Sequence, residues 1–227
     1  MISLSPRLLA AAGFVRQGVK VADVGTDHAY LPVYLLENGI ITSAVACDIG
    51  EGPLKNAAET VSASGLSHFI DLRLSDGLQN VSQNEAEDII ICGMGGELIV
   101  KILSECGWIK DSRLNLILQP MTHTEDVRRY LFSNGFFIKN EICTVEGKRT
   151  YLTLNASFGG ESSGFEEGRC YFGEFINSAD PGAVKYVKKQ LSRIMTRADA
   201  LKNVGRGEEE EKTLRQVIEY YEREKNK

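Results

Sequence analysis

From residue 19 to about residue 158, short apolar runs alternate with segments that have the apolar spacing of helices. The runs are rich in Val and Ile, as expected of strands that are buried on both faces. Most of the segments between them close on a glycine, a common end signal for a helix. This alternation predicts an α/β fold, with a mostly parallel sheet covered by helices on both faces. The predicted strands are 19–24, 43–48, 69–74, 88–93 and 114–119.

Two further extended runs, 136–146 and 148–158, follow the last predicted helix and are joined by a turn that contains Gly147. This pattern predicts a β-hairpin, which adds an antiparallel edge to the parallel strands. The complete expectation for this part of the chain is a seven-stranded sheet, preceded by a short N-terminal helix.

The composition changes after residue 158. The stretch GGESSG at 159–164 has the composition of a flexible linker. Apolar residues then recur at alternating spacings of three and four, the pattern of a coiled-coil seam, and resume after the interruption NVGRG. We therefore expect two domains, at 1–158 and 165–227, the second being a helical coiled-coil hairpin. The seam residues are Val184, Val187, Leu191, Ile194, Ala198 and Leu201, followed by Leu214, Val217, Ile218 and Tyr221.

Composition argues against several classes of protein. No stretch approaches the roughly 18 apolar residues that a membrane span needs, and the N-terminus lacks the pattern of a signal peptide. The five cysteines are scattered without a CxxC pair, which disfavours a zinc or redox site and suits a reducing compartment. We expect a cytoplasmic protein that binds no membrane and no metal.

The net charge of −5 disfavours a general polyanion binder, but the charge is unevenly distributed. Residues 185–206 contain seven basic residues and a single acidic one. Within this stretch, Lys185, Lys189, Arg193 and Arg197 recur every four residues beside the apolar seam. Such a row is either a solvated helix face or, near a nucleic-acid site, a strip that contacts phosphates.

Polar residues and glycines follow each predicted strand of the parallel part of the sheet. Ligands of such sheets bind at the carboxyl ends of the strands, near the point where the strand order reverses. We therefore expect these strand ends to form one crevice. They are Asp23–His28, Asp48, Ser75–Gly77, Gly93–Gly96 and Gln119–Met121.

The acid at the end of the second strand, Asp48, can accept hydrogen bonds from both hydroxyls of a ribose. This indicates a cofactor that contains a nucleoside. A dinucleotide would need a GxGxxG cradle for its pyrophosphate. The first loop offers the single glycine Gly25, and the carboxylates of Asp23 and Asp27 would repel a diphosphate. S-adenosylmethionine carries a sulfonium and an ammonium and no phosphate, so it suits this loop.

At the third strand end, Asp76 can accept from the exocyclic amine of the cofactor's adenine, and Gly77 leaves room for the ring. Each feature alone has a simpler explanation, because Asp48 can cap a helix, His28 can pack against a neighbour, and Asp-Gly is a common turn. Their occurrence at five successive strand ends, in this order, favours a methyltransferase of the Rossmann-like class.

The stretch GMGG at 93–96 lacks the acceptor side chain and the aromatic ring that methyltransferases of exocyclic amines usually place there. Its glycines can bring the backbone close to a flat ligand, and Met94 can lie over a ring face. A ring nitrogen keeps its own lone pair and needs proximity, alignment with the S–CH₃ bond and stabilisation of the cation that forms. Asp27 can accept from a neighbouring amine and balance that charge.

The motifs DVGTDHAYLP, ACDI, SDGL, ICGMGG and LQPM, in this order and spacing, resemble those of the bacterial tRNA (adenine-22)-N1-methyltransferase family. The resemblance covers about residues 1–157, and the C-terminal hairpin resembles that family's appended coiled coil. It implies a Rossmann-like seven-stranded methyltransferase sheet, S-adenosylmethionine as donor with S-adenosylhomocysteine as product, and a cytoplasmic monomer. The implied acceptor is N1 of an adenine in the D-arm of tRNA, which must be unstacked or flipped before transfer.

Carried onto this sequence, the resemblance implies roles for three sets of residues and none for Lys148, Arg149 and Tyr151. The implied cofactor site is Asp23, Gly25, Thr26, His28, Asp48, Ile49, Asp76, Gly77 and Gly93. The implied catalytic residues, which line the adenine pocket, are Asp27, Met94, Gly95, Gly96 and Gln119. The implied tRNA contacts are Arg7 at the pocket rim and, on the C-terminal hairpin, Lys185, Lys189, Arg193 and Arg197.

Two other functions stay open on the sequence. One is a methyltransferase that acts on a small molecule or a protein, and the other is a non-catalytic protein that binds both the cofactor and tRNA. A dehydrogenase is the least favoured reading because the first loop has no phosphate cradle.

Overall fold

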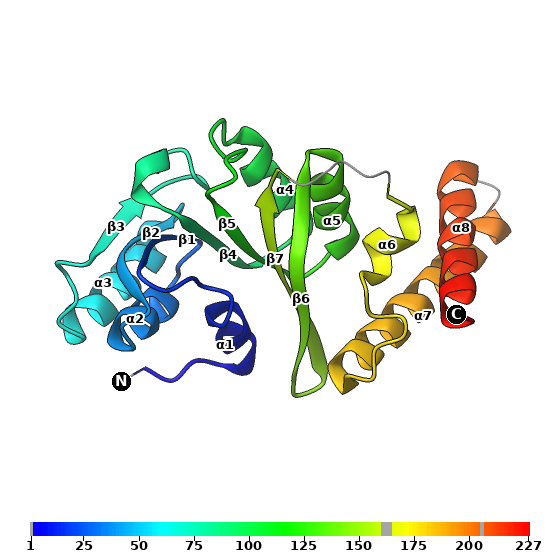
Figure 1. Cartoon of the computed structure of the whole chain (residues 1–227), viewed down its shortest axis with the longest axis horizontal. Helices are drawn as coiled ribbons and strands as arrows, with labels where there is room; N and C mark the ends of the chain where they lie inside the picture. Colours follow the sequence, from blue (N-terminus) through cyan, green and yellow to red (C-terminus); the bar gives the residue numbers. More distant parts are fainter. Residues whose placement is uncertain (1, 160–164, 205–206) are drawn as a thin grey trace.

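A seven-stranded sheet with helices on both faces runs through the computed structural model, which describes residues 2–159, 165–204 and 207–227 (Figure 1). The strand order is β3-β2-β1-β4-β5-β7-β6, with β1 to β5 parallel and the β6–β7 hairpin antiparallel. The predicted fold class is confirmed. The strands are β1 (Val19–Val24), β2 (Ile41–Asp48), β3 (Ile70–Leu74), β4 (Asp88–Met94), β5 (Asn115–Pro120), β6 (Phe136–Glu146) and β7 (Arg149–Phe158). The helices are α1 (Pro6–Ala12), α2 (Tyr30–Glu37), α3 (Glu51–Ala63), a 3₁₀ turn η1 (Gln83–Glu85), α4 (Gly96–Glu105), α5 (Thr124–Ser133), α6 (Glu167–Phe172), α7 (Pro181–Val204) and α8 (Glu208–Lys225).

The strand order reverses between β1 and β4. The chain runs outward through β1, β2 and β3, then returns to place β4 on the other side of β1. Because all five strands are parallel, their carboxyl ends meet at one edge of the sheet, where such folds bind ligands. Backbone bonds continue the ladder there, as the Ser75 N–H donates to the Asp48 carbonyl at 2.9 Å.

The sheet is apolar through its thickness because both faces are covered. In β4, Ile89 and Ile91 belong to the hydrophobic cluster on the side of α4, α5 and α7, whereas Ile90 belongs to the cluster on the side of α1, α2 and α3. All three are fully buried, and burying a side chain of this size stabilises the fold by roughly 1.5–3 kcal/mol. A one-residue slip would exchange the two faces, so this alternation fixes the register of β4.

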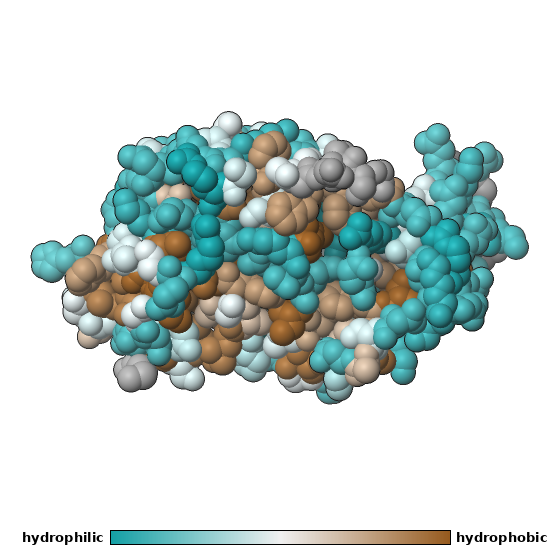
Figure 2. All heavy atoms as spheres, in the orientation of Figure 1, coloured by the Kyte–Doolittle hydropathy of each residue, from teal (hydrophilic) through white to brown (hydrophobic). Residues whose placement is uncertain are grey.

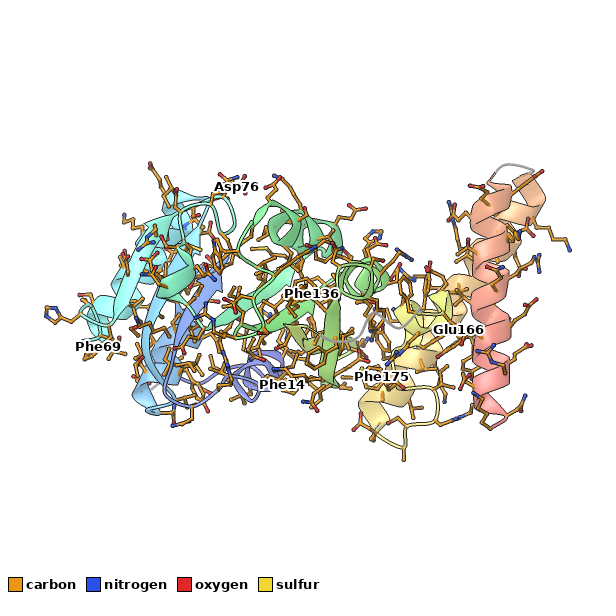
Figure 3. The ribbon with its side chains drawn as sticks, turned by 45° about the horizontal axis from the view of Figure 1, so that its top comes forward. Phe14, Phe69, Asp76, Phe136, Glu166 and Phe175 are labelled. Carbon is orange, nitrogen blue, oxygen red and sulfur yellow. The ribbon has the colours of Figure 1, made fainter. Side chains whose placement is uncertain are left out.

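The C-terminal segment forms the predicted pair of helices, α7 and α8, at one end of the molecule (Figure 1). Its surface is largely hydrophilic in the view of Figure 2. The pair belongs to the same hydrophobic cluster as the sheet, and Phe175 packs edge-on against Tyr186 of α7, with ring centroids 5.8 Å apart, where the pair meets the sheet (Figure 3). The buried residues of the predicted seam are Val187, Ile194, Ala198, Leu201, Leu214 and Val217.

The C-terminal segment contains one helix that the sequence analysis did not predict, and two short stretches of it lie outside the described residues. The short helix α6, with its fully buried Phe172, was not predicted. The predicted linker at 160–164 and residues 205–206 of the interruption NVGRG lie outside the described residues. Among the helices that are described, none has both the length and the apolar character to cross a bilayer.

A buried arginine joins the helical pair to the sheet. Arg128 on α5 is fully buried and donates to the carboxylate of Glu141 on β6, from Nε at 2.9 Å and from Nη2 at 2.6 Å. Its Nη1 donates to the carbonyl of Cys170 on α6 at 2.8 Å and to the hydroxyl of Tyr186 on α7 at 2.9 Å. One side chain therefore ties α5, β6, α6 and α7 together, which holds α7 in a fixed position.

We predict that Arg128→Met lowers the free energy of unfolding by about 3–5 kcal/mol, because it leaves the buried carboxylate of Glu141 without its cation. The matched control is Arg215→Met, which removes an exposed pair with Glu211 on α8 (2.7 Å) and should cost less than about 1 kcal/mol. Urea denaturation followed by circular dichroism measures both. Equal losses in the two variants would contradict the anchoring role of Arg128.

Candidate functional site

The turn after β1 follows a backbone path that few side chains adopt. Gly25, Asp27 and Ala29 have φ angles of 77°, 41° and 55°. The N–H groups of Gly25 and Thr26 both donate to the carbonyl of Cys47 at the end of β2, at 2.8 and 3.1 Å. Beside this turn lies a cavity of about 270 Å³. Its lining includes Arg7, Asp23, Gly25, Thr26, Asp27, His28 and Cys92.

Asp23 is a buried carboxylate at the base of this turn. It is 6% exposed, and the hydroxyl of Thr26 donates to its Oδ2 at 2.7 Å. Burial raises the pKa of Asp23 to about 6, and the carboxylate of Asp48 on the next strand adds to the rise, while the Thr26 hydrogen bond opposes it. Among the described residues, no cation forms an ion pair with Asp23. A positively charged ligand in the cavity would therefore stabilise its ionised form.

At the end of β2, Asp48 has one oxygen engaged and one available. Its Oδ1 accepts the backbone N–H of Gly50 at 2.8 Å, just before α3. Within the described part of the chain its Oδ2 has no hydrogen-bond partner. The next residue, Ile49, is 71% exposed, which is unusual for a large apolar side chain at a strand end. An acceptor oxygen beside an uncovered apolar side chain suits a ribose with an attached flat ring.

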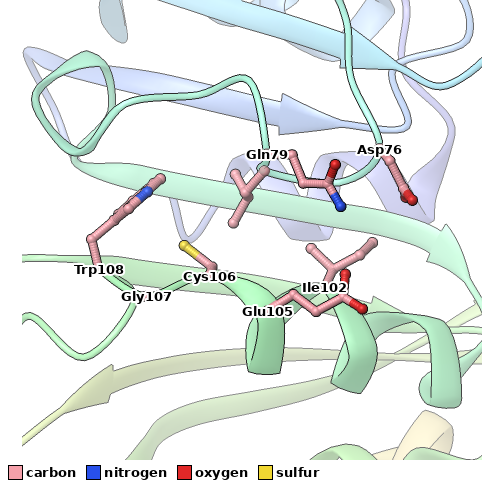
Figure 4. Close-up of a pocket in the computed structure, with 8 residues that line it drawn as sticks. Asp76, Gln79, Ile102, Glu105, Cys106, Gly107 and Trp108 are labelled. Atoms are coloured by element: carbon pink, nitrogen blue, oxygen red, sulfur yellow. The ribbon is translucent and has the colours of Figure 1, made fainter.

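At the end of β3, the Asp76 carboxylate lies 3.7 Å from Lys101 Nζ. Asp76 marks one end of a second cavity of about 310 Å³ between this loop and the C-terminal part of α4, with Trp108 at the other end (Figure 4). Gly77 has a φ of 58°, and a Cβ there would lie 2.9 Å from Ile102. The structure therefore gives Gly77 a packing reason to be glycine, in addition to the room for a ring that the sequence suggested.

The GMGG stretch connects the end of β4 to its neighbours. The terminal methyl of Met94 lies where a side chain on Gly25 would project, 2.2 Å from the Cβ position. A Cβ on Gly96 would lie 2.2 Å from the carbonyl oxygen of His123, so this glycine lets α4 approach the loop after β5. Met94 is thus brought to the turn after β1, whereas a contact of Gly95 or Gly96 with a flat ligand stays a prediction.

At the end of β5, Gln119 is fully buried and its amide is fully engaged. Its Nε2 donates to the Arg7 carbonyl and to Thr153 Oγ1, and its Oε1 accepts from Arg7 Nη1, all at 2.9 Å. The guanidinium of Arg7 also lies 5.8 Å from the ring centre of Tyr151. In this structure Gln119 positions Arg7 beside the first cavity, and a direct contact of Gln119 with a ligand stays a prediction.

The sequence analysis missed the contribution of β7 to this arrangement. Tyr151 and Thr153 are buried neighbours of Arg7 and Gln119, but Gln119 and Thr153 are 34 residues apart in the chain, and Gln119 and Arg7 are 112 apart. The alternation along β7 indicated a strand but did not show which face meets the N-terminal helix. The only available signal was that a Tyr and a Thr share one face of a predicted edge strand.

The two remaining side chains of the first turn are accessible. His28 stacks on Tyr30 with ring centroids 4.9 Å apart, and its Nε2 lies 3.6 Å from Asp27 Oδ2. The side chain of Asp27 is 65% exposed. The packing contact that the sequence left open for His28 is therefore present, and Asp27 is free to meet an incoming group.

The structure divides the basic row of α7. All four side chains are exposed. Arg193 pairs with a carboxylate of α5, and Arg197 with one of α8, both at 2.8 Å. Lys185 and Lys189 have no carboxylate within 4.0 Å in the described part of the chain, so they are the two members whose charge is not already balanced.

Comparison with known proteins is consistent with this geometry. Residues 4–154 match the family described as "Methyltransferase domain". Over 166 residues, 73% of this chain and 69% of the relative, the chain is 37% identical to the tRNA (adenine(22)-N(1))-methyltransferase of Bacillus subtilis (strain 168). The crystal structure of the B. subtilis M1A22 tRNA methyltransferase TrmK is similar with a TM-score of 0.85 at 29% identity, over 98% of this chain and 97% of that one. The structure of Streptococcus pneumoniae Sp1610 in complex with S-adenosyl-L-methionine gives 0.80 at 33% identity, over 96% and 100%.

We predict that Gly25→Ala abolishes or weakens at least tenfold the binding of S-adenosylmethionine, the cofactor predicted from the sequence. The added methyl displaces Met94 and strains a backbone with φ near 77°. The control is Gly18→Ala, which has φ near 75° but no neighbour within 4 Å of the new Cβ. Both variants carry the same backbone strain of about 1–2 kcal/mol. Calorimetric titration should nevertheless show normal affinity for the control, because Gly18 does not line the cavity. Equal affinities in the two variants would contradict the role of Met94 at this turn.

Proposed function

This chain is a member of the methyltransferase family that includes the tRNA (adenine(22)-N(1))-methyltransferases, and we propose that it methylates N1 of a D-arm adenine in tRNA. The methyl donor in this proposal is S-adenosylmethionine. The observation that carries it is the presence of carboxylates at the ends of β1, β2 and β3, together with a turn after β1 that has a single glycine. Those groups suit a cationic, phosphate-free nucleoside.

The residues present fit S-adenosylmethionine. The free oxygen of Asp48 is suited to the ribose hydroxyls, and the uncovered side chain of Ile49 to one face of the adenine ring. In this proposal Asp76, at the end of β3, accepts a hydrogen bond from the exocyclic amine. At the amino-acid end of the cofactor, the carboxylate of Asp23, which has no ion-pair partner among the described residues, suits the ammonium and sulfonium groups. Arg7, which Gln119 holds beside the same cavity, supplies a positive charge for the carboxylate of the cofactor. We therefore assign Arg7 to the cofactor as well as to the pocket rim.

Bound S-adenosylmethionine supplies the methyl group on a sulfonium, and the protein's task is to align it with the acceptor. N1 of adenine has a lone pair, so no residue needs to remove a proton before attack. The protein accelerates the transfer by aligning N1 with the methyl group and by stabilising the positive charge that develops. Asp27 is exposed beside the cavity and can accept from the adenine's exocyclic amine while balancing the positive charge that the methylated ring acquires. Met94 can provide an apolar surface against which the base lies.

The alternatives are less consistent with the structure. A dehydrogenase needs a pyrophosphate cradle, whereas the turn after β1 carries one glycine and two carboxylates. A small-molecule methyltransferase gains nothing from Lys185 and Lys189 on α7, which have no carboxylate partner in the part of the chain that the structure describes. A non-catalytic protein that binds the cofactor and tRNA would use the same groups, so only turnover distinguishes it.

We also propose a cytoplasmic monomer with two domains, at 1–158 and 165–227. The relative from Bacillus subtilis is named as a tRNA methyltransferase, and this supports a cytoplasmic location, where tRNA is modified. Chromatography with light scattering on the full chain measures the mass in solution, and a stable dimer would contradict the monomer.

The direct test is to incubate the protein with an unmodified tRNA transcript and S-adenosylmethionine, digest the RNA and analyse its nucleosides by mass spectrometry. We expect one 1-methyladenosine per tRNA, lost when the adenine at position 22 of the tRNA is replaced by guanine. Binding of tRNA without any methylated nucleoside would establish the non-catalytic alternative, and methylation of a replaced transcript would show that another nucleotide is the acceptor.

We predict that cofactor affinity depends on pH through Asp23. Its pKa is raised from 3.8 to about 6, so the carboxylate loses its charge as the pH falls through about 6. A cationic ligand needs that charge, and affinity should therefore be full above about pH 7 and about tenfold weaker at pH 5.

Without ligand, the raised pKa of Asp23 should make the fold less stable as the pH rises from about 4 to about 6.

Calorimetric titration between pH 5 and pH 8 measures the dependence of affinity on pH. Asp27, His28 and Arg7 line the same cavity, so Asp23→Asn is the control that assigns the effect. This variant should bind weakly with a flatter profile. A wild-type profile that is flat across this range would show that Asp23 does not face the ligand's positive charge.

A further inference from the structure

A third cavity lies between the loop after β5 and helix α7, with a volume of about 260 Å³. We propose that it binds a nucleotide that neighbours the target adenine, with the base inside and its phosphate at Lys189. This inference rests on the function proposed above and adds a second RNA-binding site to it. The residues that carry it are Met121, Thr122, Thr124, Thr150, Lys189 and Gln190.

The cavity is adjacent to the expected reaction site. Its lining loop follows β5 and is bonded to the GMGG stretch twice, since the N–H of Met121 donates to the Met94 carbonyl at 2.8 Å and that of Gly96 to the Thr122 carbonyl at 2.9 Å. A base that lies against Met94 is thus separated from the cavity by one loop. Consecutive nucleotides of a strand that enters at Met94 can reach it.

The walls of the cavity are suited to a nucleobase. Met121 is 40% exposed and, with Pro120 and Leu152, offers apolar surface for a ring face. The hydroxyl of Thr150 is buried and has no hydrogen-bond partner among the described residues, which leaves a donor and an acceptor for a polar ring edge. Pockets for drug-sized ligands measure roughly 300–1,000 Å³, and this cavity of about 260 Å³ would enclose the base alone, with the phosphate at its rim.

The rim of the cavity carries one unbalanced positive charge. Arg193 lines the cavity, but its guanidinium pairs at 2.8 Å with Glu125, whose side chain is only 9% exposed. Lys189 is exposed and, in the described ranges, pairs with no carboxylate. Lys185, one turn earlier on the same helix face, continues the positive charge away from the cavity. This arrangement suits the backbone of a nucleic acid, with one phosphate at the rim and the next along α7.

The wall that α7 provides is held in place. Gln190 donates to Thr124 Oγ1 at 3.0 Å and to the Tyr186 hydroxyl at 2.9 Å, and Arg128 donates to that same hydroxyl. Thr124 and Gln190 are both buried. The cavity therefore exists before RNA arrives, and binding does not have to order the helix first.

The first test compares Lys189→Ala with Lys188→Ala. Lys188 is also exposed, on the same helix, but does not line the cavity, so it is a matched loss of one charge. Affinity for tRNA is measured without cofactor over a range of salt concentrations. We expect Lys189→Ala to bind about tenfold more weakly, with the slope of log affinity against log salt reduced by about 0.7–0.9, while Lys188→Ala stays close to wild type. Equal behaviour of the two variants would overturn the proposal.

The second test asks whether a base enters. Thr150→Phe fills the cavity from β7, and its folding is checked by thermal melting. A set of tRNAs, each with one abasic nucleotide near the target adenine, is bound to the wild type and to this variant. We expect one abasic position to weaken binding to the wild type but not to Thr150→Phe. Parallel profiles would overturn the base subsite, and if the variant does not fold, the lysine comparison decides alone.

Failure of this inference can be told apart from failure of the proposed function. Formation of 1-methyladenosine by the wild type, with no difference between the lysine variants, removes the subsite and leaves the function. The expected binding differences without any methylated nucleoside leave the subsite and remove the catalytic proposal.

Discussion

The carboxylate of Asp23 is buried at the end of β1 and forms no ion pair with any described residue, and the site is organised around that charge. Burial raises its pKa to about 6, so near neutral pH this carboxylate carries a charge that no ion pair among the described residues balances. The hydroxyl of Thr26 donates a hydrogen bond to this carboxylate, and a cavity lies beside the single-glycine turn that follows it. A ligand that brings positive charge relieves the imbalance, whereas a phosphate increases it.

Opposite charges lie in two separate regions of the molecule. The acidic strand ends lie where β1, β2 and β3 finish, whereas Lys185 and Lys189, which pair with no carboxylate of the described residues, lie on α7. The buried contacts of Arg128 with Glu141 and Tyr186 fix the distance between them. In the proposed function, a nucleic acid that binds α7 meets the methyl-transfer site at a spacing set by these contacts, which favours specificity for a substrate of one shape.

Much of this arrangement could be predicted from the sequence. The alternation of apolar runs and helical segments predicts the five parallel strands, because burial on both faces of a parallel sheet leaves a continuous apolar pattern, and the turn at Gly147 predicts the hairpin that adds two more. Asp23, Asp48 and Asp76 could be found because ligand-binding residues follow directly after strands. The short helix α6 and the buried Tyr186 and Gln190 could not, since their burial depends on contacts between segments far apart in the chain.

The sequence by itself determined the order of elements, the carboxylates at the strand ends and the charge of each helix face, because these follow from local periodicity and from neighbouring residues. Only the tertiary structure decided that Gln119 holds Arg7, that Met94 covers Gly25, and that two of the four residues in the basic row of α7 are already paired. The physical reason is that hydrogen bonds, ion pairs and close packing act over a few ångströms in space. They join residues as many as 112 positions apart, and no pattern along the chain records such distances.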